Sequence, residues 1–369
     1  MGEPRGTLAA SFHIGRRAIG SGHPVFVIAE IGVNHDGSVH RAIELVAHAH
    51  AAGADAVKLQ IFRADTLMHG SSTFAGYQQE RCAESSPVAM LRRYELSPGD
   101  TATVVREIRS RGMAAIATPF SPADVETIER LDLDAVKIAS PDLVNLPLLK
   151  HSARCGKPLL VSTGAATRDE VKTAIARLHG LRLPFAMLHC VSSYPADDCD
   201  ANLCWIGELA ALGVVAGYSD HTTDLLTGAL AVACGAAVIE KHLTYDRHAA
   251  GPDHAASADP AGFASYVRAV RRAELLRGRA GKRVLKCEED VRAVSRQSLV
   301  ARVDLPAGVV IQEGDLIVQR PGTGILAGEI EKVVGVSPRA SIPAGTMLTW
   351  EMLGAPAAGD GMCPQDAAA

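Results

Sequence analysis

Two histidines in this sequence have the type and spacing expected of a metal site. His221 and His242 each follow a short apolar run, and the stretch between them, residues 224–235, has the length of one helix. If the two runs are neighbouring parallel strands, both imidazoles emerge at the same end of the sheet. Neutral imidazoles side by side would bind a divalent metal and leave coordination positions open for a substrate. The alternative for each histidine alone is burial in the core with its hydrogen bonds satisfied.

Two lysines, Lys58 and Lys137, stand at the ends of other apolar runs. An ammonium group on the inward face of a strand is costly unless an anion or an acid pairs with it. Hydroxyl side chains end or follow the neighbouring runs: Thr118, Ser140, Ser162, Ser192 and Ser219. This set predicts an anion cage, in which ammonium groups balance a phosphate or carboxylate and hydroxyl groups orient it. In the alternative, Lys58 and Lys137 pair with Glu30 and Asp142 and only hold the fold together.

Three further side chains near these positions have two interpretations each. Phe120 and Tyr194 are either plugs of the protein interior or contacts of a substrate. Cys190, beside His189, is interpreted as a packed thiol rather than a nucleophile, because the sequence places no base for it.

Eight apolar runs alternate with eight amphipathic stretches over roughly the first 280 residues. The runs cover residues 25–29, 56–59, 114–117, 135–138, 158–161, 185–188, 214–217 and 237–239. The expected helices cover residues 39–52, 98–111, 122–131, 145–155, 168–179, 202–212, 224–235 and 260–277. Continuous apolar runs are typical of strands buried on both faces. The pattern therefore predicts an α/β fold, a (β/α)₈ TIM barrel whose strand ends carry the chemistry.

The chain divides into five segments by composition. Residues 1–22 are expected to form a loosely ordered lead-in, residues 23–280 the barrel, and residues 281–294 a linker. Residues 295–353 hold short β-like runs, among them 298–303, 314–318 and 333–335, and predict a small β-rich domain. Residues 354–369 are rich in Ala, Gly and Pro and are expected to be a disordered tail. The long connection over residues 63–97 is expected to cover part of the barrel mouth.

Composition excludes several classes of function. The chain has 369 residues, a net charge of −4 and 47% hydrophobic residues, so nothing favours a nucleic acid or a membrane surface as partner. Its eight cysteines form no C-x-x-C pair and are typical of reduced thiols. No stretch has the apolar length of a membrane helix. We expect a cytoplasmic protein.

The motifs around these residues resemble the N-acetylneuraminate (sialic acid) synthase family. They include Glu30-Ile-Gly-Val-Asn-His-Asp-Gly, Lys137-Ile-Ala-Ser, His189-Cys-Val-Ser-Ser-Tyr-Pro, Tyr218-Ser-Asp-His-Thr and Glu240-Lys-His-Leu-Thr. Their order and spacing match over residues 22–280. The small domain resembles the family's antifreeze-like (SAF) module, most specifically at Val318-Gln-Arg-Pro-Gly-Thr-Gly.

The resemblance implies that phosphoenolpyruvate condenses with the aldehyde of an N-acylated hexosamine, as in N-acetylmannosamine, to give a nonulosonic acid and phosphate. The catalytic set would be Glu30, Lys58, Lys137, His221 and His242. Phosphoenolpyruvate would be held by Lys58, Thr118, Lys137, Ser140, Ser162, Ser192 and Ser219. The sugar would face Gln60, Phe120, Asp142, Tyr194, Asp253 and Arg320. The two histidines would hold Mn²⁺, or alternatively Mg²⁺ or Co²⁺, and in a homodimer the SAF module would cap the partner's barrel with Arg320.

Some alternatives stay open at the level of sequence. Pro141 and Asp142 follow Ser140 where related synthases often carry Gly and then an acidic residue, so a legionaminate or pseudaminate synthase is also consistent. A second class is a 3-deoxy-octulosonate or heptulosonate synthase on the same barrel. A third is a non-catalytic barrel that binds a sugar or a metal.

Overall fold

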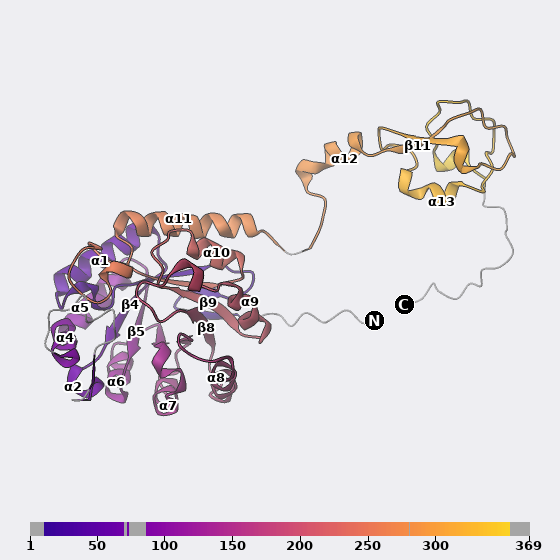
Figure 1. Cartoon of the computed structure of the whole chain (residues 1–369). Helices are drawn as coiled ribbons and strands as arrows, with labels where there is room; N and C mark the ends of the chain where they lie inside the picture. Colours follow the sequence, from indigo (N-terminus) through magenta and orange to yellow (C-terminus); the bar gives the residue numbers. More distant parts are fainter. Residues whose placement is uncertain (1–10, 70–71, 74–85, 280, 355–369) are drawn as a thin grey trace. The chain divides into compact units, whose positions relative to one another are not determined.

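The computed structural model describes residues 11–69, 72–73, 86–279 and 281–354, and it divides at Gly278 into two compact units. In the first unit eight parallel strands close into a barrel in the order β10-β3-β4-β5-β6-β7-β8-β9 (Figure 1). The strands are β3 (Phe26–Glu30), β4 (Ala56–Ile61), β5 (Ala114–Pro119), β6 (Ala135–Ile138), β7 (Leu159–Ser162), β8 (Phe185–Cys190), β9 (Val215–Asp220) and β10 (Val238–His242). The predicted TIM barrel is confirmed.

The strands continue further than the apolar runs from which they were predicted. The run over residues 214–217 grows into β9, which ends at Asp220, and the run over 237–239 grows into β10, which ends at His242. The added residues are polar, yet all of them are buried and most keep their partners in the parallel ladder. In these two strands the apolar run therefore marks the beginning of the strand, while the polar side chains occupy its carboxyl-terminal residues.

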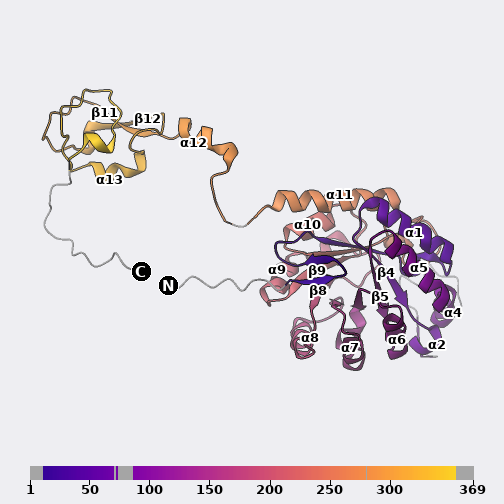
Figure 2. The ribbon, with the colours of Figure 1, turned by 180° about the vertical axis from the view of Figure 1, so that it is seen from behind.

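Helices surround the barrel and bury one face each against the strands (Figures 1 and 2). They are α1 (Val39–Ala52), α5 (Pro98–Ser110), α6 (Pro122–Arg130), α7 (Leu146–Ala153), α8 (Arg168–Gly180), α9 (Cys204–Ala211), α10 (Thr227–Ala233) and α11 (Pro260–Arg277). Their starts follow from local sequence: Ser97, Ser121 and Asp259 each cap a helix whose first residue is proline.

The expectation of a loosely ordered lead-in is wrong for residues 11–22. They form an antiparallel hairpin of β1 (Phe12–Ile14) and β2 (Arg17–Ile19). Phe12, Ile14 and Ile19 are buried and belong to the same apolar cluster as Phe26 and Val238, which begin barrel strands. The hairpin thus closes the amino end of the barrel. The apolar residues at positions 12, 14 and 19 could have indicated the hairpin. A strand of three residues, however, gives only a weak pattern in a sequence.

The long connection after β4 contains α2 (Ala64–Leu67) and α4 (Pro87–Tyr94). Phe62, Met90 and Tyr94 are buried together with Val33, and Phe120 packs against them. This part of the connection therefore covers one side of the barrel mouth, as expected. Its residues 70–71 and 74–85 lie outside the described part of the chain.

The second unit has its own apolar core, around Leu299, Leu305 and Ile342. It pairs β11 (Ser298–Ala301) with β12 (Leu316–Gln319) and also holds α12 (Glu289–Ser295) and α13 (Ile330–Val333). One expectation is corrected here, because residue 333 of the third β-like run ends α13. The predicted linker over residues 281–294 contains most of α12. Of the tail over 354–369, only Gly354 belongs to the described residues.

The sequence of the second unit contains a near-repeat, Asp304-Leu-Pro-Ala-Gly and Ser341-Ile-Pro-Ala-Gly, and the two copies face each other. Leu305 and Ile342 exchange two backbone hydrogen bonds of 2.8 Å. Across this pair, the Asp304 carboxylate accepts a hydrogen bond from the Ala344 amide, and the Ser341 hydroxyl accepts one from the Ala307 amide. The near-repeat in the sequence is therefore a local two-fold arrangement within one small domain. Among the described residues, no helix has the length and apolar character needed to cross a membrane.

The hairpin should be a substantial source of stability for the barrel. Replacing the buried Ile14 by Ala leaves a cavity at the closed end and should lower the free energy of unfolding by about 3 kcal/mol. His13→Ala, on the outward face of the same strand, should change it by less than about 0.5 kcal/mol. Urea unfolding followed by Trp205 fluorescence in a Trp350→Phe background isolates the barrel transition. Equal stability of the two variants would contradict the packed hairpin.

Candidate active site

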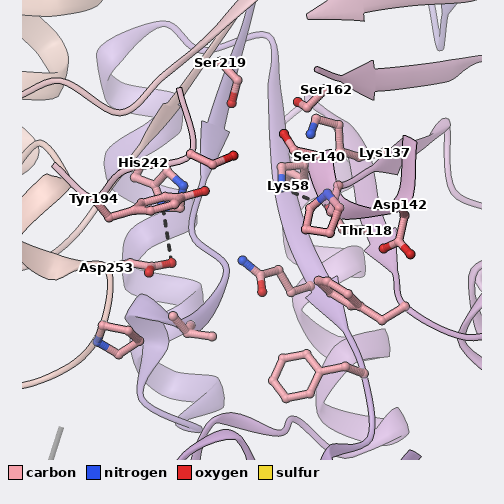
Figure 3. A pocket seen from close by; sticks show the side chains of 18 of the residues that line it. Lys58, Thr118, Lys137, Ser140, Asp142, Ser162, Tyr194, Ser219, His242 and Asp253 are labelled. Carbon is pink, nitrogen blue, oxygen red and sulfur yellow. Dashed lines mark hydrogen bonds and ion pairs between the residues drawn. The ribbon is translucent and has the colours of Figure 1, made fainter. Parts of the chain in front are cut away.

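A cavity of about 550 Å³ opens at the carboxyl ends of the barrel strands. It brings together most of the residues that the sequence predicted: Lys58, Gln60, Thr118, Phe120, Lys137, Ser140, Asp142, Ser162, Ser192, Tyr194, Ser219, His221, His242 and Asp253. Figure 3 shows the two lysines with Thr118, Ser140 and Ser162 on one side and His242, Tyr194 and Asp253 on the other. The cavity therefore has a cationic, hydroxyl-rich half and an imidazole half.

Lys58 is buried among acidic and hydroxyl groups. Its Nζ lies 2.6 Å from Glu30 Oε2 and 3.7 Å from Glu240 Oε1, and it donates a hydrogen bond of 3.1 Å to Thr118. Burial alone would lower the pKa of Lys58, but the carboxylates of Glu240 and Glu30 raise it above its ordinary value. Lys58 therefore remains an ammonium group in the floor of the cavity.

Lys137 shares its acidic partner with Lys58. Its Nζ lies 3.9 Å from Glu240 Oε1, and burial lowers the pKa of Lys137. The predicted alternative pairing with Asp142 is not observed: Asp142 accepts a hydrogen bond of 2.8 Å from Asn145 instead. Burial raises the pKa of Asp142. Lys137 thus keeps a less compensated charge that faces the cavity.

Glu240 joins the two lysines, and sequence reasoning did not single it out. Its Oε1 also accepts a hydrogen bond of 3.0 Å from Ser219. Burial would raise the pKa of Glu240, but Lys137 and Lys58 lower it, so it stays ionised. Period-two alternation could have found it, because Glu240 lies two residues before His242 on β10 and so shares its inward face.

Hydroxyl groups line the cavity next to the lysines, where the backbone of Gly164 approaches them closely. A Cβ atom on Gly164 would lie within 3 Å of Ser192 Oγ, Cys190 Sγ and Ser140 Oγ, so a side chain would fill this space. The Gly164 amide donates a hydrogen bond of 2.9 Å to Ser140. Ser162 Oγ is buried and has no hydrogen-bond partner among the described residues. A buried hydroxyl without a partner beside two lysines is suited to bind an anion.

His221 presents Nε2 as an acceptor at the cavity, with the Ser219 hydroxyl 3.5 Å away. Its Nδ1 lies 2.6 Å from the Val191 carbonyl oxygen, which can only accept, so Nδ1 carries the proton and Nε2 a lone pair. Burial lowers the pKa of His221 to about 4. The ring stacks on Tyr194 at a centroid distance of 4.1 Å. A neutral imidazole oriented by a carbonyl group is the usual form of a metal-binding histidine.

His242 lies beside His221, with ring centroids 5.6 Å apart. Burial, together with the positive charge of nearby groups, lowers the pKa of His242 well below its ordinary value. Its Nδ1 lies 3.6 Å from Asp253 Oδ2. Over the described residues, no three His, Cys, Asp or Glu side chains form a cluster that could hold a metal. Two neutral imidazoles fit a metal whose other positions are taken by substrate and water.

Asp220 and Lys241, which the sequence also places at these strand ends, lie outside the cavity. They are register partners on β9 and β10, and Lys241 Nζ lies 3.2 Å from Asp220 Oδ2. Tyr266 on α11 donates a hydrogen bond of 2.8 Å to the same carboxylate. This outward ion pair ties together the two strands that carry the histidines.

The remaining predicted residues lie in three places. Glu30 is buried beneath the cavity, where Gln60 donates a hydrogen bond of 3.1 Å to it. Phe120 packs edge-to-face on Phe62, and Cys190 lies 3.0 Å from the Ser140 hydroxyl within the wall. Arg320 is exposed on the second unit.

An apolar wall completes the cavity, and sequence reasoning did not identify it. Side chains from the long connection after β4 form most of it: Val33, Phe62, Leu67, Met68, Met90 and Leu91. The expectation of a covering connection indicated where this wall would lie. Which of its residues would face the cavity depends on how α2 and α4 fold, which the sequence did not reveal.

The chain is similar to known proteins over most of its length. A model of the NeuB family matches residues 45–282, and a model of the SAF domain matches residues 296–354. The chain is 40% identical to N,N'-diacetyllegionaminic acid synthase of Legionella pneumophila, over 90% of this chain and 95% of that protein. It is 30% identical to pseudaminic acid synthase of Helicobacter pylori, over 88% of this chain and 97% of that protein.

A solved structure of a related synthetase has the same fold. The N-acetylneuraminic acid synthetase of Leptospira borgpetersenii superimposes with a TM-score of 0.71 at 30% identity, over 77% of this chain and 95% of that chain. Fold, site and relatives together define an enzyme of the sialic-acid-type synthase class. The chain belongs to the NeuB family and carries a SAF domain after its barrel. The predicted family is confirmed.

The unpaired hydroxyl of Ser162 should serve binding and contribute nothing to folding. Ser162→Ala should leave the free energy of unfolding unchanged within about 1 kcal/mol. It should weaken the binding of inorganic phosphate about tenfold, the effect of one lost hydrogen bond to a charged group. Ser152→Ala is the matched control, because Ser152 Oγ is also buried without a hydrogen-bond partner in the described chain but belongs to α7. Calorimetric titration that shows equal phosphate affinity for both variants would contradict the assignment.

Proposed function

We propose that the enzyme condenses phosphoenolpyruvate with the aldehyde form of an N-acylated hexosamine and releases phosphate and a nonulosonic acid. One observation carries the proposal. Two buried ammonium groups and an unpaired hydroxyl line one half of the cavity, and two neutral imidazoles line the other half. Such a cavity is suited to hold an anionic donor and a carbonyl acceptor next to each other.

Phosphoenolpyruvate would occupy the cationic half. Lys58 and Lys137 would balance its charge, while hydroxyl groups would fix its orientation: Thr118, Ser140, Ser162, Ser192 and Ser219. Lys137 lies 3.9 Å from Glu240 and donates a hydrogen bond of 3.3 Å to the Ile138 carbonyl, so it is less tightly paired with a carboxylate than Lys58 and the more available of the two ammonium groups. As the phosphate leaves, these fixed donors would stabilise its growing charge without having to reorganise.

The imidazole half would hold a divalent metal on His221 and His242, and we propose Mn²⁺, with Mg²⁺ and Co²⁺ as alternatives. The neutral state of both rings and the lone pair on Nε2 of His221 fit this role. When bound, such an ion would act as a Lewis acid that polarises the aldehyde oxygen. Burial raises the pKa of Glu30, and this residue, which lies near His242, would support the site through its contacts with Lys58 and Gln60.

The residues of the chain would bring the two carbon atoms together and control water. Carbon 3 of phosphoenolpyruvate bonds to the aldehyde carbon, whose oxygen takes a proton and becomes a hydroxyl group. Water then adds at carbon 2 and loses one proton, which balances the proton taken by the aldehyde oxygen. The bond between carbon 2 and the phosphate oxygen breaks, the remaining proton of that water leaves with the phosphate, and the 2-keto acid forms. Gln60, Phe120, Asp142, Tyr194 and Asp253 would orient the sugar, and the apolar wall would limit access of further water.

Among N-acylated acceptors, the apolar wall favours one with two N-acetyl groups. N-acetylmannosamine could place one acetyl methyl group against the apolar wall. The wall presents Leu67, Met90 and Leu91 in addition to the aromatic rings, so that a second acetyl methyl group could also be buried against it. The relative from Legionella pneumophila is named for an N,N'-diacetyl product. We therefore propose an acceptor of the legionaminate type in preference to N-acetylmannosamine.

The enzyme is predicted to be active with phosphoenolpyruvate and Mn²⁺. It should prefer the doubly N-acetylated acceptor over N-acetylmannosamine by about tenfold in kcat/KM, because that acceptor buries one additional acetyl methyl group. Mass spectrometry of products from a panel of N-acylated hexoses measures this preference. Chelation of the metal, or the double variant His221→Ala with His242→Ala, should abolish turnover.

Three outcomes would contradict parts of this proposal. Phosphate release with arabinose 5-phosphate but with no N-acyl sugar would point to the octulosonate type of synthase. Turnover that survives in the double histidine variant would reject the metal role. Binding of the sugars without any product would indicate a barrel that has lost catalysis.

We also propose that the enzyme is a homodimer in which the SAF domain of one subunit caps the barrel of the other and supplies Arg320 to the sugar. Arg320→Ala and Lys137→Met should each inactivate the enzyme when alone. Hybrid dimers of the two variants should regain about a quarter to a half of the activity, because one barrel then receives an intact cap. Purified hybrids without activity, or a monomer by analytical ultracentrifugation, would reject the proposal.

A further inference from the structure

The loop after β3 carries the polar motif Asn34-His35-Asp36-Gly37, for which the proposed chemistry has no direct use. Asn34 and His35 are almost fully buried, and both lie in a short 3-10 helix behind the cavity wall. Burial of the Asn34 amide and the Asp36 carboxylate costs free energy unless both groups form hydrogen bonds. Their partners therefore indicate what the loop holds in place.

Asn34 connects this loop to the segment that follows β10. Its Nδ2 donates a hydrogen bond of 3.0 Å to the Leu243 carbonyl and one of 2.8 Å to the Ser257 hydroxyl. Ser257 in turn donates a hydrogen bond of 2.6 Å to the Asp253 carbonyl. A single amide group thus holds both ends of the segment 243–257 and, through Ser257, the backbone of Asp253.

Asp36 provides a second connection to the same segment. Its carboxylate accepts a hydrogen bond of 2.8 Å from Tyr245 and one of 3.2 Å from His254, and it also pairs with Arg41. Burial would raise the pKa of Asp36, but the hydrogen bonds from His254 and Tyr245 lower it. The side chain of His254, which directly follows Asp253, is therefore held in place by Asp36 as well.

Gly37 brings the covering helix α4 into the same assembly. It has a φ of 72°, and a Cβ atom there would lie 2.4 Å from the carbonyl oxygen of Arg93 in α4. Gly251 is approached in a similar way, since a Cβ atom would lie 2.7 Å from His254 and 3.1 Å from the Tyr94 hydroxyl. The loop 34–37, the segment 243–257 and α4 therefore pack against one another without space for added atoms.

We infer that Asn34 and Asp36 are positioning residues that fix the Asp253 carboxylate beside His242. The inference rests on the proposed metal role of His242. Asp253 Oδ2, 3.6 Å from His242 Nδ1, would orient the imidazole ring for the metal. We assign the effect of the motif on the metal ligand to its connection with Asp253 through Ser257, and so this effect should depend on the presence of that carboxylate.

A double-mutant cycle tests this dependence, with calorimetric titration of Mn²⁺ as the measurement. Asn34→Leu should raise the dissociation constant of Mn²⁺ about tenfold, the usual effect of losing a residue that orients a metal ligand. Asp253→Asn should do the same, and the double variant should bind no more weakly than Asp253→Asn. Losses that multiply in the double variant, or an unchanged constant in Asn34→Leu, would overturn the inference.

Two further arms separate positioning from general destabilisation. Ser257→Ala removes only the connecting hydroxyl and should also weaken Mn²⁺ binding. Thr101→Val is the control: it removes a comparable buried hydroxyl on α5, which donates to the Ser97 carbonyl, and should leave Mn²⁺ binding unchanged. Hydrogen exchange of the peptide over residues 243–257 should accelerate in Asn34→Leu. Unchanged exchange would refute the connection itself.

Failure of the proposed function gives a different result. Wild-type protein that binds no Mn²⁺ would reject the metal role and, with it, the part assigned here to Asp253. Mn²⁺ binding by the wild type that is indifferent to both Asn34→Leu and Ser257→Ala would reject the positioning role alone.

Discussion

A group of four buried charges at the carboxyl end of the barrel is the constraint on which the site depends. Lys58 and Lys137 share the Glu240 carboxylate, and Lys58 also pairs with Glu30. The four residues come from β3, β4, β6 and β10, so none could keep its charge at low cost unless the barrel closed. Closure and charge compensation therefore require each other. An anionic ligand enters a site whose positive groups are already fixed in place.

The alternation of side chains on β9 and β10 gives this end of the barrel two separate chemical environments. Inward residues build the cavity, while Asp220 and Lys241 pair on the outer side and hold the two strands in register. His242 is the register partner of Glu30, which in turn is the partner of Lys58. A shift of one residue would exchange the two faces and leave both histidines among apolar helix side chains. The ion pair of Asp220 and Lys241 thus stabilises the strand register that sets the distance between the two imidazoles.

The sequence was sufficient for the barrel and for most of the cavity, because apolar runs and the polar residues at their ends are local patterns. It was insufficient where side chains meet through long-range packing. Glu240 was overlooked since its run seemed to end at Ile239, and the hairpin around Ile14 was overlooked since each strand has only three residues. The apolar wall depends on the path of the connection that holds Met90. The relation of Asn34 to Asp253 spans more than two hundred positions and has no local signal.

The closed amino end of the barrel has a consequence for the order of events. Because the hairpin of β1 and β2 fills that end, reactants and products pass through the carboxyl mouth. Lys58 and Lys137 lie on strands, whereas Tyr194 and Asp253 lie on the loops above them. A donor held by the strand residues would have to arrive before the sugar, which would then block its exit. The proposed function would then follow a sequential and ordered kinetic scheme, in which the sugar acid departs before the deeper anion is exchanged.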